Sequence, residues 1–317
     1  MGQIVISVCV PCYNEESNVE LMYEAIKAQF LNQEKYVYEI VFCDNCSTDN
    51  SQQILRKIAN KDKNVKVIFN NRNFGPMRNS AYIMYQATGD AIIGMPCDFQ
   101  EPPEMIPEFI EKWSSGYKVV MGQKTKSEES LFMFKVRALY YDIIEKCSDI
   151  PQFKQVTGFG IFDKEVINMI ESLNEPQPNF RNIIAELGYP TLLLPYKQAK
   201  RKRGKSGYSF FSYFNLALET LINTSKIPLR MATTIGFICS GISFCIGIIY
   251  LVYKLIYWDS FSAGMAPVMI GLFFIGSIQL FFIGIIGEYI GGILTRVTKR
   301  PLVVERERIN FESNEKD

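Results

Sequence analysis

Two long stretches without a charged residue constrain the fold of this chain more than any other feature. No Asp, Glu, Lys or Arg occurs from Met231 to Tyr253, and none occurs from Ser260 to Gly287. Each stretch exceeds the roughly 20 apolar residues that span the hydrocarbon core of a bilayer. The alternative, a buried helical hairpin of a soluble protein, fits stretches of this length less well. The sequence therefore predicts a hairpin of two transmembrane helices at 231–290.

Basic residues flank this hairpin on one side. They precede the first stretch and follow the second, at Lys226, Arg230, Arg296, Lys299 and Arg300. The connecting loop carries only Lys254 and Asp259 as charges. Because loops rich in Lys and Arg stay in the cytoplasm, we expect both termini and the N-terminal domain on the cytoplasmic side of a multi-pass protein.

The first 205 residues alternate apolar runs with helical patterns, which predicts an α/β domain. Apolar runs lie at 4–10, 38–42, 65–69, 89–94, 118–122 and 191–196. Strands that alternate with helices at this spacing form βαβ units and a mostly parallel sheet. Polar clusters fall at the ends of the runs, so they share one rim of the sheet. In an open α/β sheet this rim is the ligand crevice.

An acid and an amide follow the apolar run at 89–94. Asp98 and Gln100 stand there, before Pro102 and Pro103 restart the chain as a helix. Both side chains offer the hard oxygen ligands that Mg²⁺ and Mn²⁺ prefer, and these ions accompany nucleotide phosphates. An ordinary strand-to-helix turn with solvated acids is the alternative, and this stretch alone does not separate the two.

Composition limits the chemistry available to the chain. There is no histidine, so the commonest general base and the commonest zinc ligand are missing. Two Cys-x-x-Cys pairs, Cys9/Cys12 and Cys43/Cys46, resemble halves of a zinc site. Since Cys9 falls within an apolar run, buried free thiols of a reducing cytosol are the preferred interpretation. A net charge of +1 gives no reason to expect a nucleic-acid partner.

A basic run and an amphipathic segment connect the α/β domain to the hairpin. Residues 200–205 read Lys-Arg-Lys-Arg-Gly-Lys, and an aromatic helical pattern follows. Such a run is compatible with nucleic-acid binding, but its position before the spans favours a membrane surface. We therefore expect a catalytic domain at 1–205, an interfacial helix at 206–230 in the headgroup layer, and a cytoplasmic tail at 291–317 after the hairpin.

Several short motifs in a fixed order resemble the family-2 inverting glycosyltransferases with a GT-A fold. In the first domain they are Pro11-x-Tyr-Asn-Glu-Glu16, Asp44-x-x-Ser-Thr-Asp49, Arg72-Asn-Phe-Gly75, Ala87-Thr-Gly-Asp90 and Asp98-x-Gln-x-Pro-Pro-Glu104. Further motifs are Arg201-x-x-Gly-x-Ser206, Pro228-Leu-Arg230, Gly287-Glu-Tyr-Ile-Gly291 and Lys299-Arg-Pro301. This second set resembles the bacterial polyprenyl-phosphate glycosyltransferases, such as bactoprenol glucosyltransferase, and more distantly dolichyl-phosphate mannose synthase. Each motif is weak alone, but the ordered set covers nearly the whole chain.

The resemblance implies a Rossmann-like GT-A catalytic domain and a role for each matched residue. The nucleotide sugar is expected at Pro11, Tyr13, Asn14, Glu15, Asp44, Asn73, Gly75 and Arg78. Asp98 and Gln100 are expected to bind Mg²⁺ or Mn²⁺, which stabilises the diphosphate leaving group. Together with Arg201 and Ser206, which are expected near the phosphates, they form the predicted catalytic set. The residues expected at the lipid phosphate or the membrane are Arg137, Arg203, Lys205 and Arg230.

Three motifs depart from the family pattern. The usual Asp-x-Asp reads Pro96-Cys-Asp98, and Asp-Asp-Gly-Ser reads Asp44-Asn-Cys-Ser47. Where relatives carry Gly-Asp-Phe-Arg, this chain has Thr157-Gly-Phe-Gly160, so an acid that serves as base is absent. Glu101, Asp90 and Asp163 are the candidates to replace this acid.

The missing acid bears on the acceptor. Loss of a positioned base costs a hydroxyl acceptor about 10²–10⁴ in rate. A phosphate monoester has a second pKa of about 6 and arrives mostly as a dianion. The departure therefore disfavours a hydroxyl acceptor more than a lipid phosphate.

These observations predict a membrane-bound hexosyltransferase of the bacterial cytoplasmic membrane. We expect it to move a hexose, best guess glucose from UDP-glucose, to undecaprenyl phosphate for modification of a cell-surface polysaccharide. The alternatives are a GT-A transferase acting on a hydroxyl-bearing glycolipid and a catalytically degenerate membrane scaffold. Retention of Asp98 and Gln100 argues against the scaffold. Glycines in the spans allow close helix packing and hence a homo-oligomer.

Overall fold

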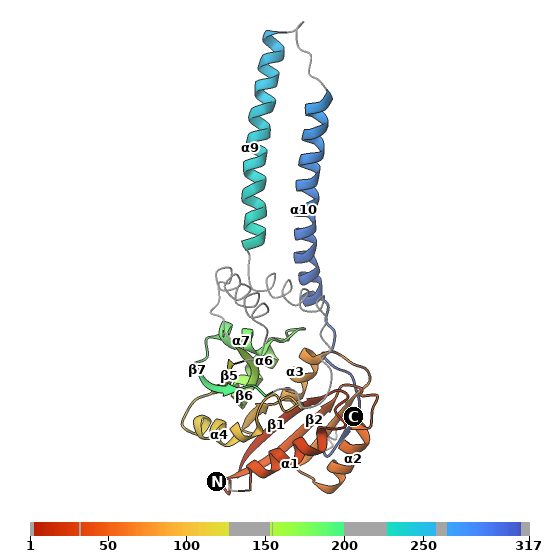
Figure 1. Ribbon diagram of the computed structural model, residues 1–317, viewed down its shortest axis with the longest axis vertical. Coiled ribbons are helices and arrows are strands. Elements are labelled where there is room, and N and C mark those ends of the chain that lie inside the picture. The colour runs from red at the N-terminus through yellow and green to blue at the C-terminus, as the bar shows by residue number, and fades with distance from the viewer. Residues whose placement is uncertain are drawn as a thin grey trace. The chain divides into compact units, whose positions relative to one another are not determined.

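The computed structural model describes residues 3–31, 33–126, 153, 155–199, 227–257 and 265–311 (Figure 1). The described residues fall into two units. One holds the residues up to 199 together with 299–311, and the other holds 227–257 and 265–298. The first unit is an α/β domain and the second consists of two long helices.

A mixed sheet of eight strands forms the centre of the α/β unit, in the order β7-β5-β6-β4-β1-β2-β3-β8. The strands are β1 (Ile4–Cys12), β2 (Tyr36–Asp44), β3 (Val65–Asn70), β4 (Ala91–Gly94), β5 (Val119–Lys126), β6 (Val156–Asp163), β7 (Thr191–Lys197) and β8 (Glu305–Ile309). Only β6 and β8 run against their neighbours. The mostly parallel sheet that the sequence predicts is therefore confirmed.

Helices cover both faces of this sheet. On one face lie α1 (Val19–Gln29), α2 (Ser51–Lys61) and α4 (Ile106–Ser114), which the 3₁₀ helix η1 (Pro103–Met105) precedes. On the other lie α3 (Pro76–Gln86), α6 (Lys164–Ser172) and α7 (Phe180–Leu187). Each strand of the centre is consequently buried on both sides, which explains its nearly continuous apolar sequence.

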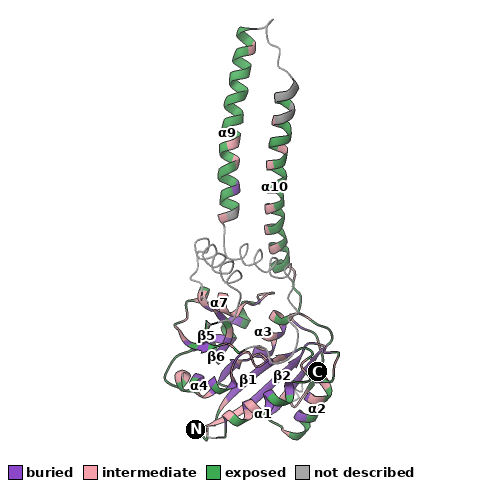
Figure 2. Cartoon of the chain, viewed as in Figure 1, coloured by how far each residue is buried: buried purple, intermediate pink, exposed green. Residues whose placement is uncertain are grey.

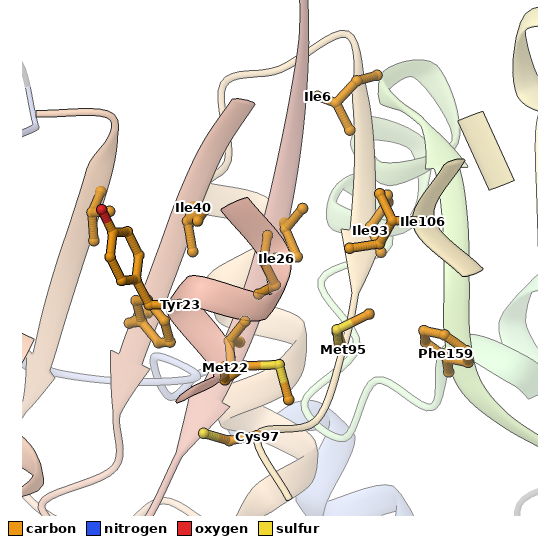
Figure 3. Packing of buried hydrophobic residues seen from close by; sticks show 14 of the residues in the cluster. Ile6, Met22, Tyr23, Ile26, Ile40, Ile93, Met95, Cys97, Ile106 and Phe159 are labelled. Atoms are coloured by element: carbon orange, nitrogen blue, oxygen red, sulfur yellow. The ribbon is translucent and has the colours of Figure 1, made fainter. Parts of the chain in front are cut away.

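Side-chain alternation along the strands divides the core into two layers. On β1, Val8 packs into the layer under α1, whereas Cys9 packs into the layer under α3. Figure 3 shows Met22 and Ile26 of α1 lying over the sheet beside Ile40. The two layers hold the strands in register, and this register sets where the loops at the strand ends meet.

Two strands are absent from the sequence-based prediction. Strand β6 contains the Thr157–Gly160 motif, and its glycines break the apolar run by which a strand is recognised. At Gly160 a side chain is impossible without movement, because a Cβ there would lie 2.3 Å from the carbonyl oxygen of Val120. Strand β8 belongs to the segment expected as a cytoplasmic tail, and it pairs with β3 instead.

The second unit contains α9 (Ile227–Ile256) and α10 (Met265–Val297). Their apolar parts, Leu229–Ile256 and Gly271–Val297, have mean hydropathies of 2.3 and 1.8 and are not buried within the molecule. Figure 2 shows both helices exposed along most of their length. Both are long and apolar enough to cross a membrane. The helices start earlier and end later than the predicted hairpin at 231–290. The interfacial helix predicted at 206–230 lies outside the described residues up to 226, and 227–230 belong to α9.

Candidate active site

Four loops leave the sheet at the same edge, at the carboxyl ends of β1, β2, β3 and β4. The register places Cys12 of β1 beside Asp44 of β2, and Asp44 beside Phe69 of β3. On the other side of β1, Cys9 lies beside Gly94, the last residue of β4. The polar clusters that follow these strands in the sequence therefore share one rim, as predicted.

The loops after β1 and β2 are bound to each other through Asn14 and Glu15. The Asn14 side-chain oxygen accepts a hydrogen bond of 2.8 Å from the Thr48 amide, and the Asn14 amide donates to the Ser47 hydroxyl at 2.9 Å. The Glu15 amide donates to Ser51 Oγ at 2.9 Å. Asn14 has a φ of 56°, a left-handed conformation that asparagine tolerates better than most residues. These bonds fix the loop on which Tyr13 stands exposed.

Asp44 is a fully buried acid at the end of β2. Its carboxylate accepts hydrogen bonds from the Ser47 amide at 3.1 and 3.3 Å and from Gln52 Nε2 at 2.9 Å. Burial raises the pKa of Asp44, and the bonds from Ser47 and Gln52 offset this only in part. Among the described residues, no cationic side chain contacts this carboxylate. Its remaining acceptor capacity suits the donor groups of a nucleoside.

The loop after β3 is bound to the loop after β2 through two asparagines. Asn73 Oδ1 accepts from Asn45 Nδ2 at 2.9 Å and from the Gly75 amide at 2.8 Å. Gly75 has a φ of 86° and precedes the first residue of α3, a conformation that glycine adopts without strain. Pro11, half-buried at the end of β1, completes this set of rim positions. The structure thus brings the predicted nucleotide residues of three loops together.

Asp98 and Gln100 occupy one tight turn after β4. The Gln100 amide donates to Asp98 Oδ1 at 3.2 Å, and Phe99 between them has a φ of 57°. The chain before this turn is joined to β1 because the Met95 amide donates to the Cys9 carbonyl at 3.0 Å, and the buried Cys97 packs in the same core layer as Cys12. Within the described part of the chain no group of three or more acidic or cysteine side chains could hold a metal ion. The acid and the amide therefore fit a Mg²⁺ or Mn²⁺ ion only if phosphate and water oxygens complete its shell.

A third acid, Glu101, lies buried at the same rim. It accepts hydrogen bonds from Tyr196 Oη at 3.1 Å and from Thr157 Oγ1 at 3.4 Å. Burial raises the pKa of Glu101, and the charge of Lys124 opposes this shift without cancelling it. Thr157 precedes Gly158, the position at which the family resemblance implies an acid. Glu101 thus places a carboxylate next to that position.

Asp90 and Asp163 are the other two candidates for the missing acid. Both lie at the opposite end of the strands from Asp98, where β4 begins. Asp90 stands before the first residue of β4, and its carboxylate accepts from the Val5 amide at 2.8 Å. Asp163 pairs with Ala91 at the start of β4 and accepts from Trp113 Nε1 at 3.0 Å. Of the three acids, only Glu101 shares the edge with Asp98.

The cysteine pairs are free thiols, as expected. Cys9 and Cys12 point into opposite layers of the core. They cannot share a metal ion in this fold. Cys43 is also buried, whereas Cys46 is half-buried in the loop after β2.

Some predicted residues fall elsewhere. Those outside the described residues are Arg137, Arg201, Arg203, Lys205 and Ser206. Arg230 stands exposed in the first turns of α9. Arg78 is at the rim, and its Nε donates to the Pro176 carbonyl at 3.1 Å.

Arg78 also lines a pocket that the sequence does not predict. The pocket measures about 450 Å³ and is lined by Asn71, Arg72, Phe74, Arg78, Arg300, Pro301 and Val304. Its last three residues come from the segment that returns to the sheet after α10. The only sequence signal for it is the Lys299-Arg-Pro301 motif, whose partners lie more than 200 residues earlier in the chain.

A mostly parallel sheet of this order, with polar loops and an acid–amide turn at the carboxyl ends of its strands, is the Rossmann-like architecture expected of a GT-A domain, with its ligand crevice at that rim. Residues 7–169 match the model of glycosyl transferase family 2, and residues 227–293 match the GtrB C-terminal hairpin. The chain belongs to glycosyl transferase family 2 and is a hexosyltransferase.

Relatives extend over nearly the whole chain. "Uncharacterized glycosyltransferase YkcC" of Bacillus subtilis (strain 168) is 32% identical over 311 residues, covering 98% of this chain and 96% of the relative. The SfII prophage-derived bactoprenol glucosyl transferase of Shigella flexneri is 32% identical over 297 residues, covering 93% and 96%. Among solved structures, S. aureus TarS 1-349 in complex with UDP-GlcNAc is similar over 69% of this chain and 66% of that one, with 20% identity and a TM-score of 0.48.

Proposed function

We propose that this enzyme transfers a hexose, namely glucose from UDP-glucose, to undecaprenyl phosphate with inversion at the sugar. The reaction takes place at the cytoplasmic face of the bacterial cytoplasmic membrane and supplies sugar for a cell-surface polysaccharide. The observation that carries the proposal is one chain joining a family 2 domain to the GtrB-type hairpin at 227–293. The relatives named bactoprenol glucosyl transferase support it over nearly the full length.

The donor lies along the rim formed by the loops after β1, β2 and β3. Asp44 accepts hydrogen bonds from the base or ribose, because the partners of its buried carboxylate among the described residues are neutral. The backbone and side chains at 11–15 border the same place. Asn73, Gly75 and Arg78 contribute from the loop after β3 and the first turn of α3.

Asp98 and Gln100 hold the divalent ion. When bound, Mg²⁺ or Mn²⁺ neutralises the charge that develops on the departing diphosphate. Because Pro96 replaces the first acid of the family motif, the protein supplies fewer ligands than its relatives. We therefore expect metal affinity to depend strongly on the nucleotide diphosphate.

A lipid phosphate is a suitable acceptor for a site without the catalytic base that the resemblance implies at position 158. The acceptor oxygen is already ionised at neutral pH, so no residue has to remove a proton. Its negative charge requires cations, which Arg137, Arg201, Arg203, Lys205 and Arg230 supply in this proposal, with Ser206 as a neutral donor. Transfer then requires the donor diphosphate and the lipid phosphate to be held close together, and positively charged side chains stabilise this arrangement.

The position of Glu101 favours a second candidate function. A carboxylate next to position 158 could remove the proton of a hydroxyl acceptor, as in transfer to a hydroxyl-bearing glycolipid. Its raised pKa brings it closer to the working range of a base at neutral pH. Competition between the two acceptor classes in one assay separates these functions.

The test is transfer of radiolabelled sugar from a panel of UDP- and GDP-sugars to undecaprenyl phosphate in detergent. We expect product that EDTA prevents, and a loss of about 10²-fold or more in Asp98→Ala. Glu108→Ala, an exposed acid on α4, serves as the control and keeps wild-type activity. Nucleotide binding without product from any donor would contradict the proposal and favour the degenerate scaffold. Product on a hydroxyl lipid alone would favour the second candidate.

A further inference from the structure

The pocket lined by Arg72, Arg78 and Arg300, here called the arginine pocket, adjoins the rim at the loop after β3, but neither Asp44 nor Asp98 lines it. It lies between the loop after β3 and the segment that leads into β8. The amide of Asn71 donates to the carbonyl of Val304 at 3.0 Å, which fixes these two walls to each other. A pocket of about 450 Å³ is large enough for a phosphate group with part of its substituent.

Three guanidinium groups border this pocket, and no acid among the described residues lines it. Arg72 donates to the carbonyl of Asn73 at 3.1 Å and stacks on the Phe74 ring at 4.1 Å. Arg78 donates to the carbonyl of Pro176. These partners are neutral, so both side chains are oriented, and no acid in the described part of the chain forms an ion pair with either of them.

The third arginine, Arg300, is exposed and makes no ion pair with an acid in the described part of the chain. Like charges around one pocket repel each other until an anion enters. This is the reverse of the nearby Arg56 and Arg308, which pair with Glu307 and Glu305. Glu305 and Glu307 of β8 are therefore engaged by other arginines, and neither lines this pocket.

The shape of the cations indicates which anion fits. A guanidinium presents parallel N–H donors that match two oxygens of one phosphate, and several together can surround it. Phe74, Pro301 and Val304 provide an apolar part of the wall. An ester of phosphate, with charge at one end and carbon at the other, suits both parts.

The chain position of Arg300 indicates where that ester comes from. Arg300 follows Val297, the last residue of the apolar helix α10, by three residues, and Arg296 and Lys299 accompany it. Basic residues directly after a span attract anionic lipid headgroups. We propose that this pocket binds the phosphate group of a membrane lipid, either a polyprenyl phosphate or an anionic glycerophospholipid. The proposal does not require sugar transfer, although it rests on the hairpin lying in a membrane.

The experiment measures lipid binding to the full chain in detergent by native mass spectrometry. Undecaprenyl phosphate, phosphatidylglycerol and zwitterionic phosphatidylcholine are added in separate titrations. We expect Arg300→Gln and Arg72→Gln each to weaken binding of the preferred anionic lipid about ten-fold, the size expected for one charge-assisted contact. Lys112→Gln, which removes a half-buried lysine charge on α4 that does not line the pocket, is the matched control and binds as the wild type does. Thermal unfolding of each variant verifies that it is folded.

The lipid panel and a nucleotide competition decide the outcome. Loss confined to undecaprenyl phosphate assigns the pocket to that lipid, and equal loss with phosphatidylglycerol assigns it to anionic headgroups in general. An unchanged dissociation constant in the Arg72→Gln/Arg300→Gln double variant would overturn the proposal. So would displacement of the lipid by saturating UDP with Mg²⁺, because the pocket would then belong to the donor. Failure of sugar transfer alone leaves this readout intact, so the two proposals can fail separately.

Discussion

Buried acids occur towards both edges of the central sheet, but their surroundings differ. Towards the amino edge, Glu39 of β2 forms an ion pair with Lys66 and accepts hydrogen bonds from Ser7 and Thr88. Burial by itself raises the pKa of Glu39, yet the bonds from Lys66, Ser7 and Thr88 outweigh it and leave the pKa lowered. Glu39 is therefore ionised, and both of its carboxylate oxygens contact side chains of the protein itself.

At the carboxyl edge, Asp44 and Glu101 show the opposite balance. Burial raises the pKa of both, and the groups that contact them are amides and hydroxyls. Such an acid is stabilised when a ligand donates a hydrogen bond or a cation approaches. Perturbed acids of this kind gather at functional sites. We infer that Glu39, towards the amino-terminal ends of the strands, stabilises the fold. Asp44 and Glu101, at the carboxyl ends, are suited to bind a ligand.

Removing Lys66, the cation that pairs with Glu39, has the largest expected effect on the free energy of unfolding. Lys66→Met leaves the buried Glu39 carboxylate without its ion pair, and breaking a buried pair in this way costs about 3–5 kcal/mol of unfolding free energy. The measurement is denaturant unfolding of the full chain in detergent, followed by Trp113 fluorescence in a Trp258→Phe background. Lys63→Met, an exposed lysine near β3, is the control. A loss below about 1 kcal/mol, as for a surface pair, would show that solvent reaches Glu39.

Protonation tests the same acid with a smaller effect. Because the pKa of Glu39 is lowered on folding, its contribution is present above the unfolded pKa of about 4.5 and is lost as the pH falls through the folded pKa. Glu39→Gln should therefore lose about 1–3 kcal/mol at pH 7, with the difference from wild type shrinking in acid. Equal destabilisation at pH 7 and pH 4 would instead indicate that packing, not charge, is affected.

For Glu101, at the carboxyl ends of the strands, the pH dependence of stability has the opposite sign. The pKa of Glu101 is raised on folding, so the wild type loses stability as the pH rises from the unfolded value of about 4.5 through the folded one. Glu101→Gln keeps a hydrogen-bond acceptor for Tyr196 and Thr157 and removes the buried charge. We expect the variant to be about 1 kcal/mol more stable than wild type at pH 8 without metal, and no more stable at pH 4. A variant that is less stable at pH 8 would place Glu101 with Glu39 as a structural acid.

The rim could be predicted because it depends on local patterns. Apolar runs that end in Asn14, Asp44 and Asp98 reveal the carboxyl ends of buried parallel strands, and such ends meet in any open α/β sheet. The family motifs then distinguish this rim from an ordinary turn. Nothing beyond chain order was needed to place these three residues together.

The missed parts depend on pairs that are distant in the sequence. Strand β8 reads Glu-Arg-Glu-Arg-Ile, which alone is typical of a solvated tail. Its strand conformation follows from partners such as Arg56 and Tyr82, which bind Glu307 and Glu305. The choice among the acids near position 158 required the antiparallel direction of β6, which places Asp163 at the far edge. The arginine pocket was not predicted for the same reason, since Arg300 and Arg72 line one pocket although they are distant in the sequence.

The smallest expected effect is on UDP binding, and it arises from a contact between β8 and the residue that binds Asp44. Arg306 of β8 donates to Gln52 Oε1 at 2.7 Å, and Gln52 Nε2 donates to Asp44 Oδ2 at 2.9 Å. The segment beyond the hairpin thereby orients the acid proposed to bind the nucleoside. Arg306→Gln should weaken UDP binding about three-fold in calorimetry, within the range of an exposed charged contact, and Arg306→Lys should restore part of it.

Arg308→Gln serves as the control for this contact, because Arg308 lies on the same strand but binds Glu305 and Gln86. If both variants weaken UDP binding equally, the cause is loosening of β8 and not the bonds through Gln52. If only Arg306→Gln does so, the carboxyl edge is adjusted from a strand that follows the membrane hairpin. Glu39 offers the internal reference, since its pH-dependent stability should be the same in both variants.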